Sequence, residues 1–242
     1  YKKGELTLTP SFFAKRILFN KYNLKCIDVV SNGIDLNRFN PERVDFEKLK
    51  DFKKRYSLGG SSVLIYVGRL APEKNVSYLL KIMKCLKEKK IKLLIVGRGK
   101  SKERMEKEIE DSGMNKEIVL TGYLEGMNLL CAYSCADIFI LPSFNELQSI
   151  ATLEAMSMRN AILVGEYKEN AAQELVKGGI NGYAFSLREP GDAAEKICKI
   201  LFCDNLKRAM QENSFKMAQE HNIQRSILKL KKIYMRLRNK ED

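Results

Sequence analysis

The chain has 242 residues, and its 45% hydrophobic and 30% charged residues are typical of a soluble globular protein of one large domain or a domain with appendages. Its 43 Lys and Arg outnumber its 30 Asp and Glu, and the net charge of +13 favours anionic partners: nucleotides, phosphorylated substrates, nucleic acid or an acidic membrane surface. No apolar run reaches the roughly 18 residues that would span a bilayer, which excludes a transmembrane helix.

The first 60 residues form an N-terminal flank outside the main alternating pattern. We expect a helix at Phe12–Tyr22, a strand at Ile27–Val30, a linker near Pro41 and a basic helix at Phe46–Tyr56. The sequence opens with Tyr1 and not with Met, which we interpret as the middle of a longer polypeptide. Residues 1–60 are therefore predicted to be the end of a preceding domain and a linker.

Short apolar runs then alternate with amphipathic stretches over residues 61–203. The predicted strands are Val63–Val67, Lys92–Val96, Ile118–Thr121, Asp137–Leu141, Ala161–Val164 and Gly182–Phe185. The predicted helices are Val76–Glu88, Ser101–Ser112, Gly126–Ser134, Ile150–Ser157, Ala171–Val176 and Asp192–Phe202. Because the strands are almost continuously hydrophobic, the pattern predicts an α/β fold with a doubly wound parallel, Rossmann-like sheet.

Residues 204–242 are predicted to be a C-terminal helical tail. Within it, Asn222–Arg238 has apolar residues on one face and basic residues on the other. We expect this helix to dock on a partner domain or cover the sheet, and an anionic membrane is the alternative.

Several predicted strands end in a glycine: Gly68, Gly97, Gly122 and Gly165. Ligands of such sheets bind beyond the carboxyl ends of the strands, where a glycine lets the backbone approach them closely. The loops that begin at these glycines are therefore the candidate binding site.

Two of these loops carry residues suited to a nucleotide. Arg69 and Lys74 follow Gly68, and two cations from one short loop suit a diphosphate. Gly97 and Arg98 end the next strand. Gly97-x-Gly99 lacks the third glycine of the dinucleotide fingerprint, which disfavours a hydride-transfer enzyme.

Two carboxylates eight positions apart, Glu146 and Glu154, lie around the start of the helix predicted at Ile150–Ser157. The free N–H groups and the dipole of a helix N-terminus favour an anion, and carboxylates accept hydrogen bonds from hydroxyl groups. The combination of a phosphate site with hydroxyl acceptors predicts a pocket for a nucleotide sugar.

The sequence contains Asn32-Gly33-Ile34-Asp35 with Phe39, Gly68-Arg69-x4-Lys74-Asn75, Val96-Gly97, Gly122, Pro142-Ser143-x2-Glu146-x7-Glu154-Ala155-Met156 and Glu174-Leu-Val-x3-Gly-Ile-Asn181-Gly182-Tyr-x-Phe185. Together these motifs resemble the group 1 (family 4) retaining glycosyltransferases of GT-B fold, and in particular their C-terminal, donor-binding half. The resemblance covers about residues 25–200.

This resemblance implies a role for each matching position. Arg69 and Lys74 hold the donor diphosphate, and Glu146 holds hydroxyls of the transferred sugar; these three are the candidate catalytic residues. Glu154 accepts hydrogen bonds from the ribose. The remaining implied contacts are with the phosphates, through the backbone N–H groups of Gln148, Ser149 and Ile150, and with the base, through the loops that include Gly68, Gly97, Arg98, Tyr123 and Leu124.

The resemblance also implies no metal ion or cofactor, and a UDP-sugar as co-substrate. The acceptor domain is expected in the same longer chain or in a separate subunit. The segment Glu146-Leu-Gln148 resembles a variant found in enzymes that glycosylate diacylglycerol, which indicates a membrane surface as a possible partner.

The six cysteines form no Cys-x-x-Cys pair and the only histidine, His221, is far from any cysteine cluster in sequence. We therefore expect buried, reduced thiols in a cytoplasmic or membrane-peripheral protein and no zinc site. For the leading interpretation, a nucleotide-sugar enzyme, no nucleic-acid partner is expected. Two alternatives stay open: half of a nucleotide-sugar epimerase, and a non-catalytic basic module that binds nucleic acid or an anionic membrane.

Overall fold

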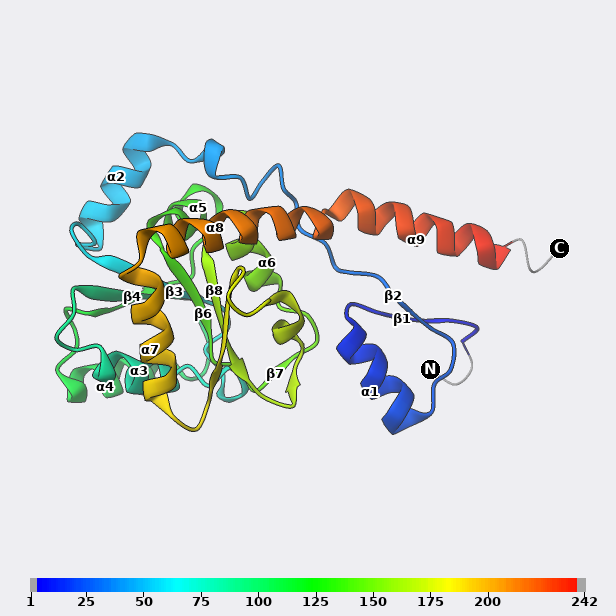
Figure 1. Cartoon of the computed structure of the whole chain (residues 1–242), viewed down its shortest axis with the longest axis horizontal. Helices are drawn as coiled ribbons and strands as arrows, with labels where there is room; N and C mark the ends of the chain where they lie inside the picture. The colour runs from blue at the N-terminus through cyan, green and yellow to red at the C-terminus, as the bar shows by residue number, and fades with distance from the viewer. Residues whose placement is uncertain (1–3, 239–242) are drawn as a thin grey trace.

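A six-stranded parallel sheet forms the centre of the molecule (Figure 1). The computed structural model describes residues 4–238, and its sheet has the order β10-β8-β6-β3-β4-β5. The strands are β3 (Ser62–Val67), β4 (Ile91–Val96), β5 (Ile118–Gly122), β6 (Ile138–Leu141), β8 (Ala161–Glu166) and β10 (Gly182–Ser186). From β3 the next strands in sequence, β4 and β5, lie on one side, and the later strands β6, β8 and β10 lie on the other side. The prediction of a doubly wound parallel sheet is therefore confirmed.

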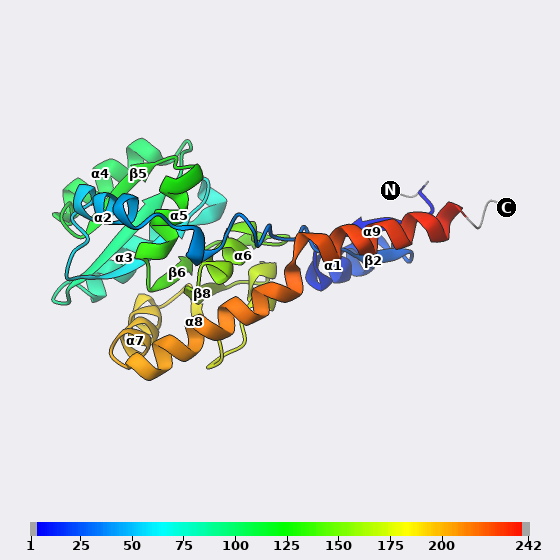
Figure 2. The same ribbon diagram turned by 90° about the horizontal axis from the view of Figure 1, so that it is seen from above.

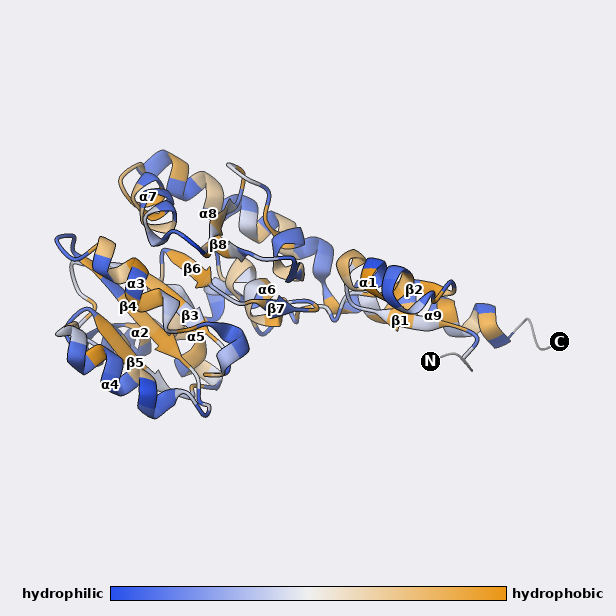
Figure 3. Cartoon of the chain, turned by 90° about the horizontal axis from the view of Figure 1, so that it is seen from below, coloured by the Kyte–Doolittle hydropathy of each residue, from blue (hydrophilic) through white to orange (hydrophobic). Residues whose placement is uncertain are grey.

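Helices cover both faces of this sheet (Figure 1). They are α3 (Tyr78–Cys85), α4 (Lys102–Ser112), α5 (Gly126–Cys135), α6 (Ile150–Ser157), α7 (Pro190–Leu201) and α8 (Asp204–Ala218). Helix α3 packs against α7 and α6 packs against α8. Because the sheet is covered on both sides, Leu94 and Ile140 in its centre are fully buried. Figure 3 shows the strands as mostly hydrophobic ribbons beside helices with hydrophilic outer positions.

Local sequence explains the ends of these helices. In α4, Met105 and Ile109 are one turn apart and face the core, and the helix ends at Gly113 with a left-handed φ of 67°. Helix α2 (Phe46–Arg55) begins at Asp45, whose carboxylate accepts a hydrogen bond from Lys48 N.

An outer unit projects from the sheet unit, and it consists of residues 4–30 with helix α9 (Ile223–Arg238) (Figures 1 and 2). Here β1 (Thr7–Thr9) pairs in parallel with β2 (Ile27–Val29), and helix α1 (Phe12–Tyr22) connects the two strands. The strand predicted at Ile27–Val30 therefore belongs to this separate two-stranded sheet. Helix α9 lies along it, with Ile233 buried and an ion pair of 2.6 Å from Arg236 to Asp28.

The chain passes between the outer unit and the sheet unit twice, once at Ile34 and once at His221 and Ile223. These two segments are called the chain crossings. The backbone N–H of Ile34 donates to His221 O over 2.8 Å, and Ile223 N donates to Ile34 O over 3.0 Å. Gly33 permits this contact, because it has a φ of 76° and a Cβ added there would lie 2.7 Å from the Cα of Ile223. The two crossings are thus in direct backbone contact.

Some elements differ from the expected ones. The segment predicted as a helix at Ala171–Val176 is a short 3-10 helix, η3 (Ala171–Leu175), and η1 (Pro41–Arg43), η2 (Pro72–Lys74) and η4 (Gln219–His221) are further 3-10 turns. The parallel pair of β7 (Asn145–Glu146) and β9 (Glu169–Asn170) was not predicted, since two residues carry no periodic signal. Within residues 4–238, no helix is both long enough and apolar enough to cross a membrane.

The six cysteines are free thiols, but the expectation that they are buried is only partly right. Cys131 and Cys135 in α5 are buried, whereas Cys26, Cys85 and Cys203 are exposed.

Candidate functional site

A largely buried ion pair lies at the carboxyl end of the sheet, in the loops that follow β3 and β6. Lys74 Nζ is 2.7 Å from Glu146 Oε1, and the two side chains are only 14% and 11% exposed. Ser143 Oγ donates to the same oxygen over 2.8 Å. Since β3 and β6 are neighbours in the sheet, the structure brings together two predicted site residues that are 72 positions apart.

Arg69, the second predicted cation, has a different partner. Its guanidinium is 2.9 Å from Glu73 Oε1 and the side chain is 73% exposed. The backbone carbonyl of Arg69 accepts a hydrogen bond of 2.8 Å from the hydroxyl of Tyr66, whose pKa burial raises well above its usual value. The backbone of Arg69 is therefore fixed at the strand end, while its side chain lies in solvent outside the Lys74–Glu146 pair.

Three of the predicted glycines meet at this edge through their backbones. Gly97 N donates to Gly122 O over 2.8 Å, and Gly68 N donates to Val96 O over 3.0 Å. A Cβ added to Gly97, which has a φ of 147°, would lie 1.9 Å from Gly68 O. Only a glycine at position 97 therefore allows the loops after β3 and β4 to lie this close together.

Arg98 and Tyr123 lie together at the ends of β4 and β5. The guanidinium carbon of Arg98 is 5.0 Å from the centroid of the Tyr123 ring, a cation–π contact, and Tyr123 is 58% exposed. Leu124 follows and is half-buried. An exposed ring beside a planar cation provides a surface on which a flat aromatic group can stack.

The predicted phosphate-binding turn is the N-terminus of α6. Ser149 is its N-cap, and its hydroxyl accepts a hydrogen bond of 3.2 Å from Thr152 N. The N–H groups at the start of an α-helix have no intrahelical acceptor, so Ile150 N is available to an anion. The serine thus has a structural role that sequence analysis did not foresee.

The Gln148 side chain contacts Ser31 and Asn32, just before the first chain crossing. Its Nε2 donates to Ser31 Oγ over 2.9 Å, and its Oε1 accepts a hydrogen bond of 2.8 Å from Asn32 N. These two hydrogen bonds therefore hold the loop that carries Glu146 against the segment of Ser31 and Asn32. A further contact to the outer unit comes from Ser11, whose hydroxyl donates to Leu147 O over 2.6 Å.

Glu154 lies on α6, one turn beyond its first residues, and points toward α5. Its Oε2 accepts a hydrogen bond of 2.7 Å from the hydroxyl of the fully buried Tyr133. Burial raises the pKa of the Glu154 carboxyl, while the Tyr133 hydrogen bond and the charge of Arg38 oppose that shift.

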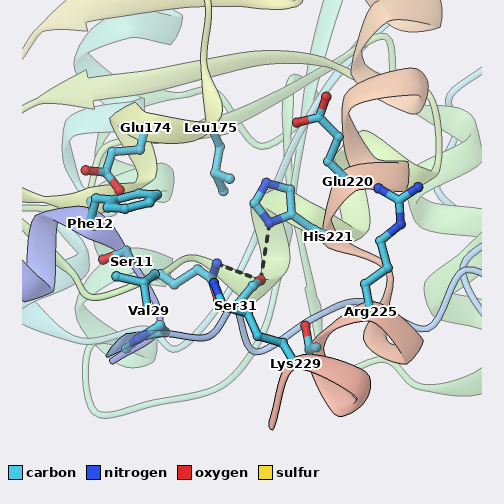
Figure 4. Close-up of a pocket in the computed structure, with 14 residues that line it drawn as sticks. Ser11, Phe12, Val29, Ser31, Glu174, Leu175, Glu220, His221, Arg225 and Lys229 are labelled. Atoms are coloured by element: carbon cyan, nitrogen blue, oxygen red, sulfur yellow. Dashed lines mark hydrogen bonds between the residues drawn. The ribbon is translucent and has the colours of Figure 1, made fainter. Parts of the chain in front are cut away.

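A cavity of about 400 Å³ lies beside Gln148, between the outer unit and the sheet unit (Figure 4). Phe12, Glu174, His221 and Arg225 are among the side chains that line it. Ser31 Oγ accepts hydrogen bonds from Gln148 Nε2 and Gly33 N, so its own proton points to His221 Nδ1, 3.2 Å away. This assigns the ring proton of the neutral imidazole to Nε2.

Sequence analysis missed four residues of this region: Ser143, Tyr133, Ser31 and His221. Ser143 stood inside a quoted motif, and Tyr133 was the one phenol in an apolar helix, but neither fact shows what the hydroxyl contacts. Among residues 4–238, no group of three or more His, Cys, Asp and Glu side chains is placed to hold a metal ion.

Comparison with known proteins assigns the family. Residues 47–217 match the family described as Glycosyl transferases group 1, and the chain belongs to that family. This finding confirms the resemblance to group 1 glycosyltransferases, and the retaining mechanism stays a prediction.

Individual relatives agree with this assignment. An uncharacterised glycosyltransferase of Methanocaldococcus jannaschii is 29% identical over 99% of this chain and 60% of its own length. A processive diacylglycerol alpha-glucosyltransferase of Acholeplasma laidlawii is 24% identical over 97% of this chain and 68% of its own length. The chain thus spans about 60% of the first of these relatives.

Solved structures agree on the fold. The crystal structure of Anabaena HepE in complex with UDP and glucose superposes with a TM-score of 0.85 at 16% identity, over 96% of this chain and 63% of that one. With such neighbours, the sheet unit is the Rossmann-like half of a GT-B glycosyltransferase fold.

Proposed function

We propose that this chain is the donor-binding part of a retaining glycosyltransferase that uses a nucleoside-diphosphate sugar, with UDP as the carrier. The observation that carries the proposal is the largely buried Lys74–Glu146 pair at the carboxyl edge of the sheet, next to the N-terminus of α6. A cation, a hydroxyl acceptor and a helix N-terminus at one edge match the three parts of a sugar diphosphate.

The diphosphate binds to Lys74, Arg69 and the first N–H groups of α6. The ammonium of Lys74 has three protons, of which one is directed to Glu146, so two stay available to phosphate oxygens. Arg69 reaches the donor by leaving Glu73, and an exposed ion pair of this kind stabilises the protein by under about 1 kcal/mol.

The two glutamates bind hydroxyl groups on either side of the diphosphate. Glu146 accepts from the transferred sugar, and Ser143 and Lys74 hold its carboxylate in place. Glu154 accepts from the ribose.

The base lies against the loops after β4 and β5. The exposed ring of Tyr123 and the guanidinium of Arg98 form the stacking surface. The Anabaena neighbour that was solved with UDP and glucose supports a UDP-linked donor.

Charge explains how this arrangement promotes transfer. Breaking the bond between sugar and phosphate builds negative charge on the departing diphosphate. Fixed cations stabilise that charge more in the transition state than in the ground state. Loss of one such group typically lowers turnover by about 10²–10³-fold, which is the effect we expect for Arg69→Ala in the complete enzyme.

The acceptor half is proposed to come from the rest of a longer chain or from a separate subunit. The Acholeplasma relative acts on diacylglycerol by its name, and the net charge of +13 suits an anionic membrane, so a cytoplasmic protein working at the membrane surface fits best. The isolated chain should bind donor without efficient turnover.

Calorimetric titration of the chain with UDP, GDP and ADP, repeated at two salt concentrations, tests the proposal. We expect micromolar binding with a preference for UDP, and about tenfold weaker UDP binding by Arg69→Ala, because a charged hydrogen bond contributes about 1.5–3 kcal/mol. Arg104→Ala is a matched control, since Arg104 is as exposed as Arg69 and also forms an i,i+4 pair, with Glu108 on α4. Equal, steeply salt-dependent binding of all three nucleotides would instead identify a non-catalytic basic module.

A further inference from the structure

The hydrogen bond between Tyr133 and Glu154 connects a buried residue of the sheet unit to a residue of the proposed donor site. Tyr133 is in the last turn of α5 and is 0% exposed, whereas Glu154 is partly exposed. The Tyr133 hydroxyl has one proton, and it lies 2.7 Å from Glu154 Oε2 but 3.4 Å from Ala151 O. The carboxylate therefore receives this proton, because the shorter contact is the stronger hydrogen bond.

The Tyr133 ring is held firmly, so its hydroxyl is a fixed point. The ring meets Phe39 edge-on, with centroids 6.3 Å apart and planes inclined by 78°. The peptide carbonyl of Tyr133 also accepts a hydrogen bond of 3.0 Å from Asn160 Nδ2. A donor fixed in this way sets the direction of the carboxylate to which it donates.

The two oxygens of Glu154 differ in consequence. Oε2 faces α5 and is bound to Tyr133, and within residues 4–238 this is the only hydrogen bond of the carboxylate. The last torsion of a glutamate is otherwise broad, so without Tyr133 the carboxylate would sample many orientations. With Tyr133 in place, Oε1 keeps one orientation and its full capacity to accept hydrogen bonds.

We propose that Tyr133 is a positioning residue for nucleotide recognition, which fixes the Glu154 carboxylate so that its free oxygen accepts hydrogen bonds from the vicinal diol of the donor ribose. This inference rests on the proposed function, since it needs a ribose at Glu154. It adds a residue that never touches the ligand and whose effect is confined to recognition of the diol.

The groups that face the carboxylate support this role. Burial opposes its ionisation, and the hydroxyl of Tyr133 and the charge of Arg38 favour it. Arg38 itself lies over the ring of Phe39, at 5.1 Å from its centroid. Tyr133 thus both orients the carboxylate and helps to keep it in the form that accepts two hydroxyl protons.

The test compares UDP with 2′,3′-dideoxy-UDP, which lacks the diol, on the 242-residue chain. We expect the unmodified chain to prefer UDP by at least about tenfold, as a hydrogen bond to a charged group contributes about 1.5–3 kcal/mol. In Tyr133→Phe this preference should fall to within about threefold, with dideoxy-UDP binding unchanged. Tyr78→Phe is the matched control: it removes a tyrosine hydroxyl that donates to Ser186 O over 3.0 Å on α3, and it should keep the preference.

The outcomes distinguish a failure of this inference from a failure of the proposed function. If Tyr133→Phe keeps the tenfold preference, the positioning role is wrong and the donor site stands. If the unmodified chain binds UDP without any preference for the diol, Glu154 does not read the ribose and the inference is likewise overturned. If the unmodified chain binds no nucleotide, both proposals fail.

A second variant covers the case in which Tyr133→Phe does not fold. Glu154→Gln keeps the shape of the side chain and can still accept from Tyr133, but it replaces the free oxygen by an NH₂ donor. We expect this variant to lose the preference for UDP over dideoxy-UDP, and an undiminished preference would overturn the inference.

Discussion

The sheet unit and the outer unit of this chain are built in different ways. In the sheet unit the strands are buried on both faces, and residues such as Ile65, Leu94 and Ile140 have no exposed surface. In the outer unit large apolar side chains, including Phe12 and Met235, are more than half exposed, and Ile233 is the only residue of α9 that is buried.

This difference shows where the chain has a hydrophobic core of its own. Burial of apolar surface is the main source of folding free energy, so the sheet unit has what it needs to fold as one structure. The outer unit depends on the two chain crossings and on a few contacts such as the bond from Ser11 to Leu147 O. All residues proposed to bind the donor lie on the sheet unit.

Truncation of one buried residue in each unit tests this difference most directly. Leu94→Ala in β4 should lower the free energy of unfolding by about 3–4 kcal/mol, because it leaves a cavity in a core that cannot collapse around it. Ile233→Ala should cost only about 1–2 kcal/mol, since one side of α9 is already open to solvent. Urea denaturation followed by circular dichroism measures both, and equal losses would contradict the distinction between the units.

The same distinction explains how much of the fold could be predicted from the sequence. The six strands of the sheet were predicted to within a few residues, because runs such as Val63–Val67 are hydrophobic at every position and end at a glycine. Strands β1, β7 and β9 have two or three residues each and are defined by their partners, Ile27–Val29 for β1 and each other for β7 and β9. Such pairing is a tertiary property that no local pattern contains.

The candidate site was predictable in its positions and less so in its contacts. That Lys74 and Glu146 would line one site was implied by the resemblance of their motifs, but their direct ion pair was not foreseen. That Arg69 would pair with Glu73, and that Gln148 would reach Ser31, depends on side-chain directions that the sequence does not specify. The roles assigned to these residues stay predictions until donor binding is measured.

A smaller expected effect concerns the closest backbone approach at the edge of the sheet unit. Gly97→Ala should destabilise the chain by about 3 kcal/mol, because its new Cβ would overlap Gly68 O and its φ of 147° is strained for any other residue. Gly113→Ala, at the end of α4, is the matched control: its φ is 67°, no atom lies within 4 Å of the added Cβ, and about 1 kcal/mol is expected. Thermal unfolding of the two variants distinguishes a clash from backbone strain alone, and similar losses would disprove the close approach.

The pH dependence of stability probes the junction between the two units. Burial lowers the pKa of His221 below its usual 6.5, and the nearby Glu220 opposes this only in part. The unfolded chain therefore takes up the proton first, so the stability that neutral His221 contributes is complete above pH 6.5 and is lost as the pH falls through 6.5 toward the folded pKa. The loss can reach at most about 1.4 kcal/mol for each pH unit in that window.

The corresponding measurement is the urea midpoint between pH 7.5 and pH 5.5, compared with that of His221→Gln. Because carboxylates titrate in the lower part of this range in both proteins, the difference between the two pH profiles isolates the histidine. Parallel profiles would show that His221 is as accessible to protons in the folded chain as in the unfolded one.

The smallest effect is expected for the ion pair between α9 and β2. Arg236 and Asp28 are only 2.6 Å apart, but the arginine is 54% exposed, so water and salt compete with the contact. Arg236→Ala should therefore lower the free energy of unfolding by less than about 0.5 kcal/mol, and 0.5 M NaCl should abolish even that difference. A loss of 2 kcal/mol or more would mean that this single pair, and not the burial of Ile233, holds α9 against β2. In that case the outer unit would be stabilised mainly by an electrostatic contact, and the two units would differ in the kind of interaction that holds them together.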